Sequence, residues 1–586
     1  MILQALTAYY EQLLRTGQIA APGWDHSFKV SYWLRIGPDG QLLDLVDCRQ
    51  RVPKGKKEVL APREMPVPAH VKRSSGIAAN FLCDNSTYLL GADEKGKPER
   101  SRQCFEACAA LHHKLLDGVD SPVARAILAF LDTWKPENAP SHPLLAPCWK
   151  DLTNNANLLF DYEGPEGRIL ANEDEAIQNA WQQYYSSRTP ADAATVQCLV
   201  TGKQAPAEKT HPSIKGVKDA QSSGAALVSF NAPAFCSYGH EQGENAPVSE
   251  YAAFAYTTAL NKLLADRDHC RILGDTTVVC WAENASPGYA SLGMMGMFGV
   301  PEDAGVTEDD LRKALELLAD GRPCPWLNQE MLQPGQHFYI LGLSPNAARI
   351  SVRFFLRDTF EVFAQRLQRY ADETEIVRPA NDKWAALPIW ALVWETVNQN
   401  ARDKKPSPQL AGDLLRAVLT GGRYPATLLN GAVLRIRAEQ SVTRGRAAIL
   451  KAYYLRNEPT DINKEVFTVS LNESTNVPYI LGRLFSVLET LQEAANGTST
   501  IRARYFNSAC ATPALVFPTL LKLAQKHLQK IGGGLAVSYS QQITGLMALV
   551  PDDGFPARLS LPDQGKFEIG YYHQTQKRYT KKNEEE

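Results

Sequence analysis

The chain has 586 residues, with 62 Lys and Arg against 64 Asp and Glu, which gives a formal net charge of −2 at pH 7. Hydrophobic residues make up 44% and charged residues 22%, proportions typical of a folded globular protein and not of a disordered one. The near-neutral charge argues against a protein that coats nucleic acid over its whole surface, so any nucleic-acid binding must depend on local basic patches.

The N-terminal residues 1–17 predict an amphipathic helix, because Glu11 and Arg15 interrupt the apolar run that a signal peptide needs. The sequence also lacks an apolar run of about 18 residues, the length that favours a membrane span. Its eleven cysteines form no CxxC pair and no regular spacing, which is typical of reduced thiols in a cytoplasm. We therefore expect a cytoplasmic protein with no membrane partner.

Helix and strand patterns alternate over the first 375 residues. Residues 28–46 predict a β-hairpin, and residues 51–73, with seven Lys or Arg, two Glu and four Pro, predict an extended basic loop. Cys104 and Cys108 have helical spacing and are expected to be buried thiols. Helical patterns occupy residues 101–116, 121–134 and 174–186, and strand patterns occupy residues 225–230, 276–282, 337–343 and 349–357.

The apolar rhythm breaks near residues 372–382, and the pattern beyond has a helical period. Apolar residues within 479–495 fall on one helix face, and a second such stripe lies within 520–531. The sequence therefore predicts an α+β protein. A mixed N-terminal α/β domain with small sheets and hairpins is expected over residues 1–380, followed by a helical bundle over residues 381–586.

Several catalytic signatures are absent from the sequence. There is no GxxxxGK[ST] phosphate loop, no GxSxG elbow and no His-Asp dipeptide of the metal-nuclease kind. Residues 240–244 approach the HExxH zinc motif, but Glu244 stands where the second histidine must fall. We expect no enzyme activity, no cofactor and no metal; a magnesium site built from distant carboxylates is the alternative that the sequence leaves open.

The stretch RISVRFFLR, residues 349–357, alternates with the period of a strand. The residues expected to face a core are Ile350, Val352, Phe354 and Leu356. The residues expected on the opposite face are Arg349, Ser351, Arg353, Phe355 and Arg357. Guanidinium groups around an aromatic ring suit phosphates and bases, so Arg349 and Arg353 are candidate DNA contacts. A solvated face with surface ion pairs is the alternative.

Cations are also dense further along the chain. Between residues 401 and 457, eleven Lys or Arg stand against three acids, and Lys522, Lys526 and Lys530 recur at every fourth position opposite an apolar stripe. Like charges four residues apart repel one another in a helix, and a polyanion would relieve that repulsion. Lys522 and Lys526 are therefore candidates for sequence-independent DNA contact, with a solvated face as the alternative.

Residues 211–239 surround a predicted strand with amide, hydroxyl and basic side chains. Lys215, Gln221 and Ser222 precede the strand, and Asn231 and Tyr238 follow it. Asn and Gln can bond the acceptors on a minor-groove floor, and glycines permit close backbone approach. DNA readout is one interpretation of this pattern, and an ordinary turn rich in Gly, Ser and Asn is the other.

Longer stretches of the sequence carry a family resemblance. They are RSSGIAANFLCDNSTYLLG (73–91), HPSIKGVKDAQSSGAALVSFNAPAFCSYG (211–239), NAPVSEYAAFAYTTALN (245–261), GDTTVVCWA (274–282), GGRYPATLLNGAVLRIRAE (421–439), YILGRLFSVLETLQEAA (479–495), RYFNSACATPALVFP (504–518) and GYYHQTQKRYTKK (570–582). In these, and nearly end to end, the chain resembles the large subunit of the subtype I-C CRISPR surveillance complex, Cascade.

The resemblance implies a non-catalytic subunit of an antiviral defence complex. Such a subunit is expected to recognise the protospacer-adjacent motif in double-stranded DNA, to promote unwinding and R-loop formation, and to support recruitment of a helicase-nuclease. Because crRNA base pairing reads the target, the protein needs to read only the short motif and the backbone. Residues 1–380 would recognise the motif duplex and dock at the crRNA end, and residues 381–586 would contact the displaced strand.

The resemblance also implies a set of partners. They are crRNA, the double-stranded target DNA with its displaced single strand, the Cascade backbone and 5′-handle-binding subunits, a small helical subunit translated from the 3′ portion of the gene, and the helicase-nuclease effector. Two other classes of function compete with this interpretation: a nuclease acting on DNA or RNA in the same defence system, and a pure assembly scaffold.

Two of the quoted stretches carry the predicted motif-duplex contacts. These residues are Lys72, directly before the first stretch, Arg73, Asn80 and Asn85 within it, and Lys215, Gln221, Ser222, Asn231 and Tyr238 in the second. The cations would hold phosphates, Asn and Gln would probe minor-groove acceptors, and Tyr238 would wedge or stack at the opened base pair. The alternative for Asn80 and Asn85 is that they only cap turns beside the hydrophobic residues 81–83.

Overall fold

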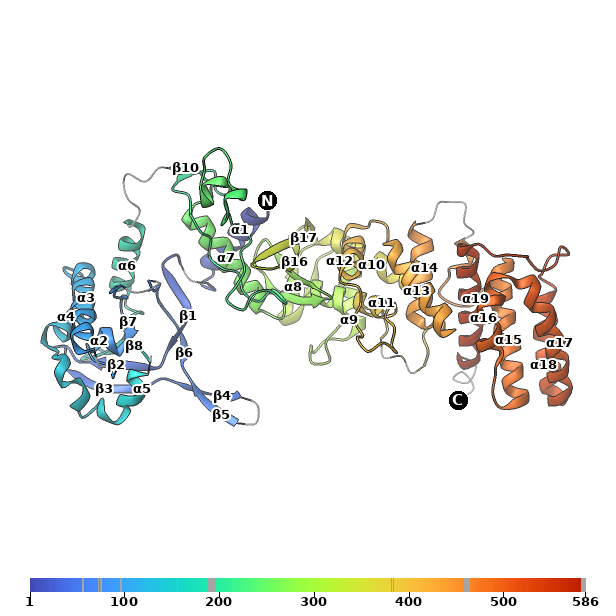
Figure 1. The fold of residues 1–586 in the computed structure, drawn as a ribbon, viewed down its shortest axis with the longest axis horizontal. Helices are drawn as coiled ribbons and strands as arrows, with labels where there is room; N and C mark the ends of the chain where they lie inside the picture. The colour runs from blue at the N-terminus through green and yellow to red at the C-terminus, as the bar shows by residue number, and fades with distance from the viewer. Residues whose placement is uncertain are drawn as a thin grey trace. The chain divides into compact units, whose positions relative to one another are not determined.

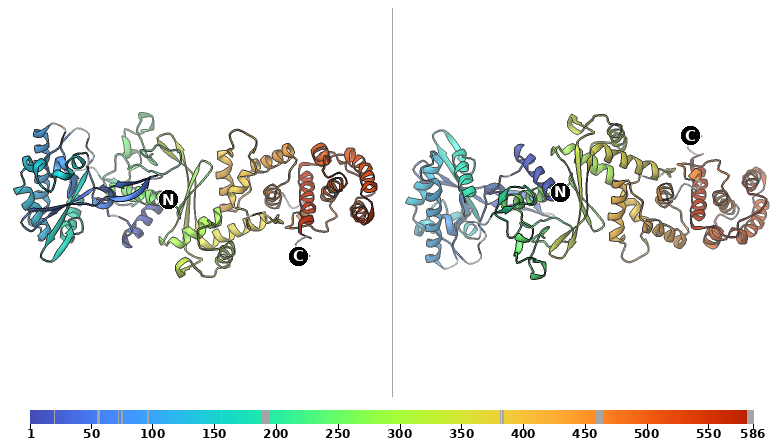
Figure 2. Two further views of the ribbon diagram at one scale, coloured as in Figure 1. Left: turned by 90° about the horizontal axis from the view of Figure 1, so that it is seen from below. Right: turned by 90° about the horizontal axis from the view of Figure 1, so that it is seen from above.

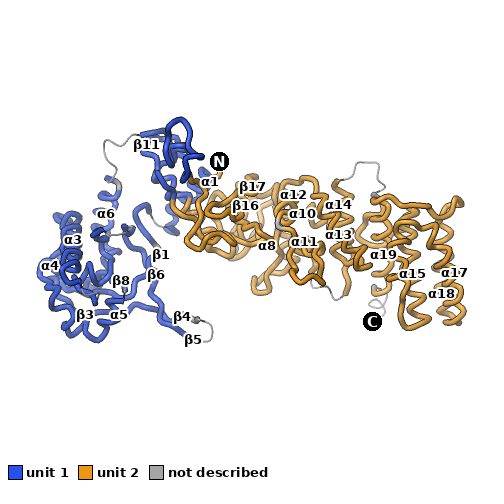
Figure 3. The backbone as a smooth tube through the Cα atoms, viewed as in Figure 1, with its two compact units in different colours: residues 1, 3–211, 230–256 blue, residues 2, 212–229, 257–586 orange. Residues whose placement is uncertain are grey.

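The computed structural model describes residues 1–19, 21–54, 57–71, 73, 76–94, 97–154, 156–187, 195–380, 382, 384–457 and 464–580. The chain folds into two compact units, coloured separately in Figure 3. Unit 1 comprises residues 1, 3–211 and 230–256, and unit 2 comprises residues 2, 212–229 and 257–586. The chain thus leaves unit 1 at residue 212, returns at residue 230 and leaves again at residue 257.

A five-stranded sheet lies at the centre of unit 1 (Figure 1). Its order is β3 (Leu42–Asp47), β2 (Tyr32–Ile36), β8 (Asn157–Gly164) and β7 (Cys83–Asn85), with β9 (Gly167–Leu170) also paired to β8. Strands β2 and β8 run parallel, and the other pairs run antiparallel. The helices α3 (Pro98–Leu116) and α4 (Pro122–Thr133) pack together, and α4 contacts both β2 and β8. Both helices lie where their sequence patterns predict them.

The predicted hairpin over residues 28–46 is confirmed in β2 and β3, but its first strand divides. Residues Trp24–Val30 form a separate strand, β1, which pairs with β6 (Arg63–Pro68), and β2 begins at Tyr32. The break falls at Ser31, whose backbone N–H donates to Asn157 O instead of continuing the pairing with β6. One alternating stretch of sequence therefore serves two sheets.

The predicted basic loop over residues 51–73 is wrong. Most of this segment is β4 (Gln50–Lys54), β5 (Lys57–Ala61) and β6. Strands β4 and β5 pair as an antiparallel two-stranded sheet, and β1 and β6 form another. Prolines are tolerated in such strands because both strands of a two-stranded sheet are edges, where a missing N–H need not break a ladder. The prolines therefore mark edge strands here and not a loop.

Unit 1 also contains shorter elements and an amphipathic N-terminal helix. In α1, Leu6, Tyr10 and Leu13 are buried, as the sequence pattern predicts. The bounds are α1 (Ile2–Arg15), α2 (Ser86–Leu89), α5 (Trp149–Thr153), α6 (Glu175–Ser187), β10 (Val196–Gln197), β11 (Gln204–Ala205), and the 3-10 turns η1 (Pro136–Ser141), η2 (Ala146–Cys148), η3 (Pro233–Phe235) and η4 (Gln242–Asn245). Helix α7 (Glu250–Ala265) begins in unit 1 and ends in unit 2.

Unit 2 begins with a four-stranded antiparallel sheet. Its order is β12 (Cys270–Leu273), β13 (Thr276–Ala282), β16 (His337–Asn346) and β17 (Arg349–Thr359), which confirms the strands predicted within 276–282, 337–343 and 349–357. The helices α8 (Pro287–Phe298), α9 (Glu308–Ala319) and α10 (Phe360–Thr374) accompany this sheet, and β14 (Cys324–Trp326) pairs with β15 (Glu330–Leu332) beside the turn η5 (Leu327–Gln329).

The strand predicted over residues 225–230 is wrong. Ala225 and Ala226 form only isolated bridges, to Ile214 and to Arg349 respectively. Although β17 continues beyond Arg349 as an edge strand, the described residues after Ala226 form no further bridge to it. Its apolar composition reflects partial burial and not a strand.

Helices fill the rest of unit 2 and follow one another along it in both views of Figure 2. The bounds are α11 (Ile389–Trp394), α12 (Pro408–Thr420), α13 (Ala426–Glu439), α14 (Arg444–Asn457), the turn η6 (Lys464–Val466), α15 (Val477–Asn496), α16 (Ile501–Ala511), α17 (Pro513–Ile531), α18 (Gly533–Met547) and α19 (Leu561–Thr580). The predicted stripe of α15 is buried, and in α17 Leu520 and Ala524 are buried. The α+β class and the helical C-terminal part are confirmed.

The predicted division near residue 380 falls inside unit 2, between α10 and α11. One buried hydrophobic cluster runs from Leu273 in β12 to Tyr572 in α19, so the sheet and the helices share a core. Residue 380 therefore lies close to where strands give way to helices. Whether the residues on either side fold independently stays a prediction.

Three features of the described residues bear on the expected chemistry. Cys104 and Cys108 are buried in α3, as predicted. Among these residues, none of the helices combines the length and the apolarity needed to cross a membrane. Over the same residues, no group of three or more His, Cys, Asp or Glu is arranged to hold a metal ion.

Candidate nucleic-acid interface

The first predicted segment is organised around the buried carboxylate of Asp84 in β7. Asp84 Oδ1 accepts from Arg73 Nη1 at 2.9 Å and from the Asn85 N–H at 2.8 Å, while Oδ2 accepts from the Asn80 N–H at 3.0 Å and from Arg73 Nη2. Arg73 also donates to Ala78 O and lies over the ring of Tyr88, 3.8 Å from its centroid. Burial lowers the pKa of Arg73, but the hydrogen bonds and charge of Asp84 outweigh burial and raise it. The guanidinium is thus a fixed internal cation.

The two asparagines of this segment are also directed inward. Asn80 is buried; its Oδ1 accepts from the Val71 N–H at 2.9 Å, and its Nδ2 lies 3.1 Å from His70 Nδ1. Asn85 occupies the N-cap position of α2, but its side chain makes no capping hydrogen bond, and within the described part of the chain its buried Oδ1 has no hydrogen-bond partner. This geometry favours the turn-ordering alternative for Asn80, whereas the side chain of Asn85 gives it no such support. Lys72 lies outside the described residues, and DNA contact by this segment stays a prediction.

In unit 2, residues 212–229 form a loop closed at its base by paired hydrogen bonds between Ile214 and Ala225. Asn261 of α7 holds one side, because its Oδ1 accepts from the Lys215 N–H at 2.8 Å and its Nδ2 donates to Ser213 O at 3.1 Å. Lys218 holds the other side: its N–H donates to Thr277 Oγ1, and its Nζ donates to Gly274 O at 2.8 Å. The loop is therefore attached to α7 and to the β12–β13 turn.

This anchoring leaves three of the predicted contacts facing solvent. Lys215, Gln221 and Ser222 are exposed. Gly224 has a φ of +102°, and a Cβ there would lie 2.6 Å from Ser213 Cβ, so only glycine fits. Gly224 therefore permits close packing against Ser213 within the loop itself, while Gln221 and Ser222 remain available to a ligand.

The basic face of β17 is less open than its sequence predicts. Arg353 pairs with Asp275 at 2.9 Å, Arg357 lies 3.8 Å from Glu283, and Arg349 belongs to the bridge with Ala226. The aromatic rings on this face, Trp281 and Tyr339, stack with centroids 5.2 Å apart and are buried. The arrangement favours the alternative of ion pairs on the sheet over an open platform for bases. Arg349 and Arg353 stay predictions as DNA contacts.

One predicted core residue of β17 is wrong. The pairing with β16 shifts between Gly342 and Leu343, which oppose Phe354 and Val352, so Arg353 is an inserted residue. A bulge reverses the alternation of faces beyond it. Val352 is consequently 40% exposed, whereas Ile350 and Phe354 are buried.

The loop of residues 231–245 in unit 1 is ordered by Asn245. Its Oδ1 accepts from the Ser237 N–H at 2.8 Å, and its Nδ2 donates to His240 O and Gln242 O. Glu241 and Glu244 form a capping box over η4. At the centre of this loop Tyr238 is 99% exposed and has a φ of +55°, an uncommon conformation for a residue with a side chain.

Four of the eleven cations within residues 401–457 do not contribute to a basic surface. In α14, Arg444, Arg446, Lys451 and Arg456 are directed inward. Arg456 pairs with Glu373 at 2.6 Å, and Lys451 Nζ donates to the carbonyls of Asp372 and Glu375. These cations stabilise contacts between α10 and α14 and are unavailable to phosphate.

Helix α17 instead presents cations to solvent. Lys522 and Lys526 are exposed, and neither has an ion-pair partner among the described residues. Lys530 is exposed too, but its Nζ donates to Asn496 Oδ1 at 2.7 Å. No acidic residue occurs between residues 513 and 550, so the field of these lysines is not cancelled within α17 and α18.

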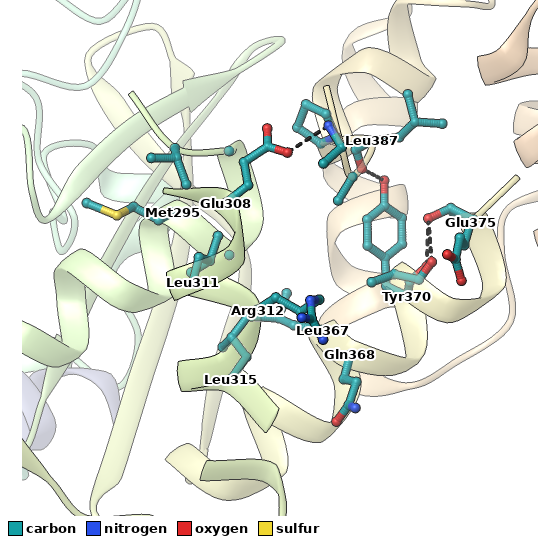
Figure 4. Close-up of a pocket in the computed structure, with 18 of the residues that line it drawn as sticks. Met295, Glu308, Leu311, Arg312, Leu315, Leu367, Gln368, Tyr370, Glu375 and Leu387 are labelled. Carbon is teal, nitrogen blue, oxygen red and sulfur yellow. Dashed lines mark hydrogen bonds between the residues drawn. The ribbon is translucent and has the colours of Figure 1, made fainter. Parts of the chain in front are cut away.

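A pocket of about 580 Å³ lies between α9, α10 and residues 385–388 of unit 2 (Figure 4). Leu311, Leu315 and Leu367 line it, Glu308 accepts from the Ala385 N–H at 2.7 Å, and Tyr370 OH donates to Leu387 O at 2.8 Å. Carboxylates of Glu316, Asp372 and Glu375 also line it. Five carboxylates in all line the pocket against two arginines, Arg312 and Arg444, a balance of charge that disfavours phosphate.

The structure divides the predicted residues between the two units. Unit 1 holds Arg73, Asn80, Asn85, Asn231 and Tyr238, and unit 2 holds Lys215, Gln221, Ser222, Arg349, Arg353, Lys522 and Lys526. Sequence reasoning missed Asp84, Asn245 and Asn261, which order the loops. Asp84 lies in the short strand β7 and pairs with Arg73, and the two asparagines bond to residues outside any local pattern, so none of the three leaves a local signal.

A family model described as CRISPR-associated protein (Cas_Csd1) matches residues 6–579. A comparison with curated proteins finds no match.

Proposed function

The chain belongs to the Cas_Csd1 family of CRISPR-associated proteins, the large subunits of type I-C Cascade, and we propose that it recognises the protospacer-adjacent motif in duplex DNA and promotes opening of that duplex into an R-loop. In this proposal crRNA pairing reads the target, while the protein reads the short motif and the DNA backbone. The assembled complex then recruits a separate helicase-nuclease.

The observation that carries this proposal is the ordered loop around Tyr238. A fully exposed aromatic ring gains nothing from folding of this chain alone, yet Asn245 and the capping box hold the backbone that presents it. A ring held in advance loses little conformational freedom when it binds. An aromatic wedge of this kind suits insertion at a base step or stacking on an unpaired base.

Two further features support DNA as the ligand. The loop of residues 215–224 exposes an amide, a hydroxyl and an ammonium group on an anchored backbone, which are the groups that contact base edges and phosphates. Lys522 and Lys526 add cations that act independently of sequence. The proposal assigns motif recognition to the loops and displaced-strand contact to α17.

The test uses Cascade reconstituted with crRNA and a target duplex carrying 2-aminopurine next to the motif, whose fluorescence reports base unstacking. Tyr238→Ala should slow opening about 10-fold, because stacking on an aromatic ring contributes about 1–3 kcal/mol per base. Tyr238→Phe should retain most of the rate. Tyr579→Ala, at an exposed tyrosine on α19, is the matched control.

Asn245→Ala should slow duplex opening by a similar factor, because it removes the hydrogen bonds that order the loop while the ring of Tyr238 is kept. Hydrogen exchange at the Ser237 amide should accelerate in this variant and not in Tyr238→Phe. Opening at the wild-type rate in both Tyr238→Ala and Asn245→Ala would contradict the wedge.

The proposal includes no catalytic step by this chain, and a nuclease acting on DNA or RNA is the competing function. Purified protein with Mg²⁺ or Mn²⁺ and labelled DNA or RNA tests this directly. Cleavage that a carboxylate or histidine substitution abolishes would overturn the non-catalytic assignment. Motif selection unchanged by Gln221→Ala and Ser222→Ala would favour a scaffold over direct reading by the 215–224 loop.

A further inference from the structure

Strands β4 and β5 form a two-stranded ribbon whose described side chains are exposed on both faces. Val52 lies opposite Val59 and shares its face, and Arg51 lies opposite Leu60 on the other. All four are exposed, with Leu60 at 55%. Figure 1 shows the ribbon extending away from the five-stranded sheet and helices of unit 1. An isolated two-stranded hairpin is at best marginally stable in water, so the ribbon is suited to gain contacts from a partner.

The charge of the ribbon indicates an anionic partner. Residues 50–61 contain four Lys or Arg and one Glu in a chain whose net charge is −2. Lys54 and Lys57 are directly opposed in the ladder, and like charges in that position destabilise a hairpin. The ion pair between Arg51 and Glu58, at 3.9 Å and largely exposed, offsets little of this repulsion. A polyanion would relieve it.

The same residues argue against two alternative partners. An added protein strand is disfavoured, because Pro53 and the flanking lysines are features that keep sheet edges from pairing. A single strand of RNA or DNA is disfavoured, because residues 50–61 include no aromatic side chain on which bases could stack. A duplex groove requires neither an open edge nor an aromatic ring.

We propose that the β4–β5 ribbon enters the major groove of the target duplex. That groove of B-form DNA is wide enough for a two-stranded ribbon, whereas the deep, narrow major groove of an RNA helix is not. In this position Arg51, Lys54 and Lys57 neutralise phosphates on the groove walls, and Val52 and Val59 contact apolar base edges such as thymine methyl groups. The inference rests on the proposed function, since it takes the motif-bearing duplex as the ligand.

Photo-cross-linking in the complete crRNA-loaded complex tests the location. A benzophenone amino acid replaces Leu60 in one preparation and Leu199, another exposed leucine of unit 1, in the control. After addition of the target duplex, residue 60 should cross-link to DNA and residue 199 should not. Cross-links from residue 60 to crRNA or to a protein subunit, or none to DNA, would overturn the proposal.

Charge variants of the same complex test the energetics. The triple variant Arg51→Ala, Lys54→Ala, Lys57→Ala should bind both motif-bearing and motif-mutated duplex at least 10-fold more weakly, with a salt slope reduced by about 2–3. Arg51→Lys with Lys57→Arg keeps the charge and should bind as wild type. Unaltered binding by the triple variant would refute the ribbon contact.

The two proposals fail in distinguishable ways. If wild-type complex discriminates the motif but the triple variant binds normally, only the ribbon contact is wrong. If wild-type complex does not discriminate motif-bearing from mutated duplex, the proposed function itself is wrong, whatever the ribbon does.

Discussion

Asp84 shows how one buried side chain fixes a segment that sequence patterns assign to DNA. Its two oxygens accept from Arg73 and from the backbone of Asn80 and Asn85. Removing one partner of a buried ion pair leaves the other charge uncompensated, which costs far more than losing a surface pair. At the residue scale, the first role of Arg73 is therefore to stabilise unit 1, and contact with a ligand comes second.

We predict that Arg73→Ala lowers the free energy of unfolding by about 3 kcal/mol, because it leaves Asp84 buried without a counter-charge. Urea unfolding measures the change. Arg51→Ala, at an exposed arginine of the same unit, should change it by less than about 0.5 kcal/mol. Unchanged stability in Arg73→Ala together with weaker duplex binding would restore the phosphate-contact role.

The buried carboxyl of Glu568 in α19 predicts how the stability of the fold depends on pH. Burial raises the pKa of its carboxyl from an ordinary 4.5 to about 8, and the charge of Arg437 lowers it only in part. The folded state therefore keeps the proton to higher pH than the unfolded state. This contribution to stability is complete below about pH 4.5 and is lost as pH rises through about 8.

Glu568→Gln should remove that dependence, since the amide does not titrate. At pH 8.5 the variant should be more stable than wild type by a few kcal/mol at most, given 1.36 kcal/mol per pKa unit, and the difference should vanish near pH 5. Thermal unfolding across pH 5–8.5 measures both. Parallel pH profiles for the two proteins would show that Glu568 does not titrate as described.

At the scale of elements, β17 shows how one inserted residue changes which side chains reach a core. Strict alternation places Val352 and Phe354 on the same face, but the bulge at Arg353 exposes Val352 and leaves Phe354 buried. Register in a sheet depends on the partner strand as well as on the strand's own pattern. The alternation of side chains within residues 349–357 cannot by itself reveal an inserted residue.

We predict that Phe354→Ala costs about 3–5 kcal/mol of unfolding free energy, because it leaves a cavity in the shared core of unit 2. Val352→Thr should cost less than about 0.5 kcal/mol, as expected of an exposed strand position. Urea denaturation of both variants compares them under one condition. A large loss for Val352→Thr would mean that the alternation of the sequence, and not the bulge, describes β17.

Helix α17 carries the other element-scale prediction. Lys522 and Lys526 have no described ion-pair partner, whereas Lys530 is engaged with Asn496. Lys522→Ala with Lys526→Ala should weaken DNA binding across all sequences and reduce the slope of log affinity against log salt by about 2. Lys313→Ala, at an exposed lysine whose charge is paired with Asp309 on α9, is the matched control and should leave the slope nearly unchanged. Loss confined to one motif would contradict sequence-independent contact.

At the scale of the whole molecule, the helices of unit 2 depend on residues before 380. Glu373 pairs with Arg456, the Val377 N–H donates to Val469 O, and Tyr572 OH donates to Val377 O. These contacts join α10 and its following segment to α14 and α19. Residues before 380 therefore contribute contacts to the helical part of unit 2.

We predict that a fragment of residues 360–586 is more stable than one of residues 381–586, with a melting temperature higher by roughly 10 °C. The shorter fragment leaves Lys451 and Arg456 without the carbonyls and carboxylate that α10 provides, and unpaired buried charges cost several kcal/mol. Circular dichroism melts measure both. Lys451→Met with Arg456→Met should recover part of the loss in the shorter fragment, and equal melting temperatures would support an independent domain beginning at 381.

The sequence by itself determined the class of the fold, the main helices and three of the four strands in the sheet of unit 2, because helix and strand periods are local and survive in a single chain. It also carried the family resemblance that the family model confirms. It located the loops around Gln221 and Tyr238, whose composition excludes regular structure.

Only the tertiary structure decided which cations face solvent and how the basic segment after Gln50 is paired. Arg353 meets Asp275 from 78 residues away, and Arg456 meets Glu373 across two helices. The pattern of cations in the sequence is the same whether those cations pair with distant carboxylates or bind phosphates. The distinction depends on long-range contacts, which no local period encodes.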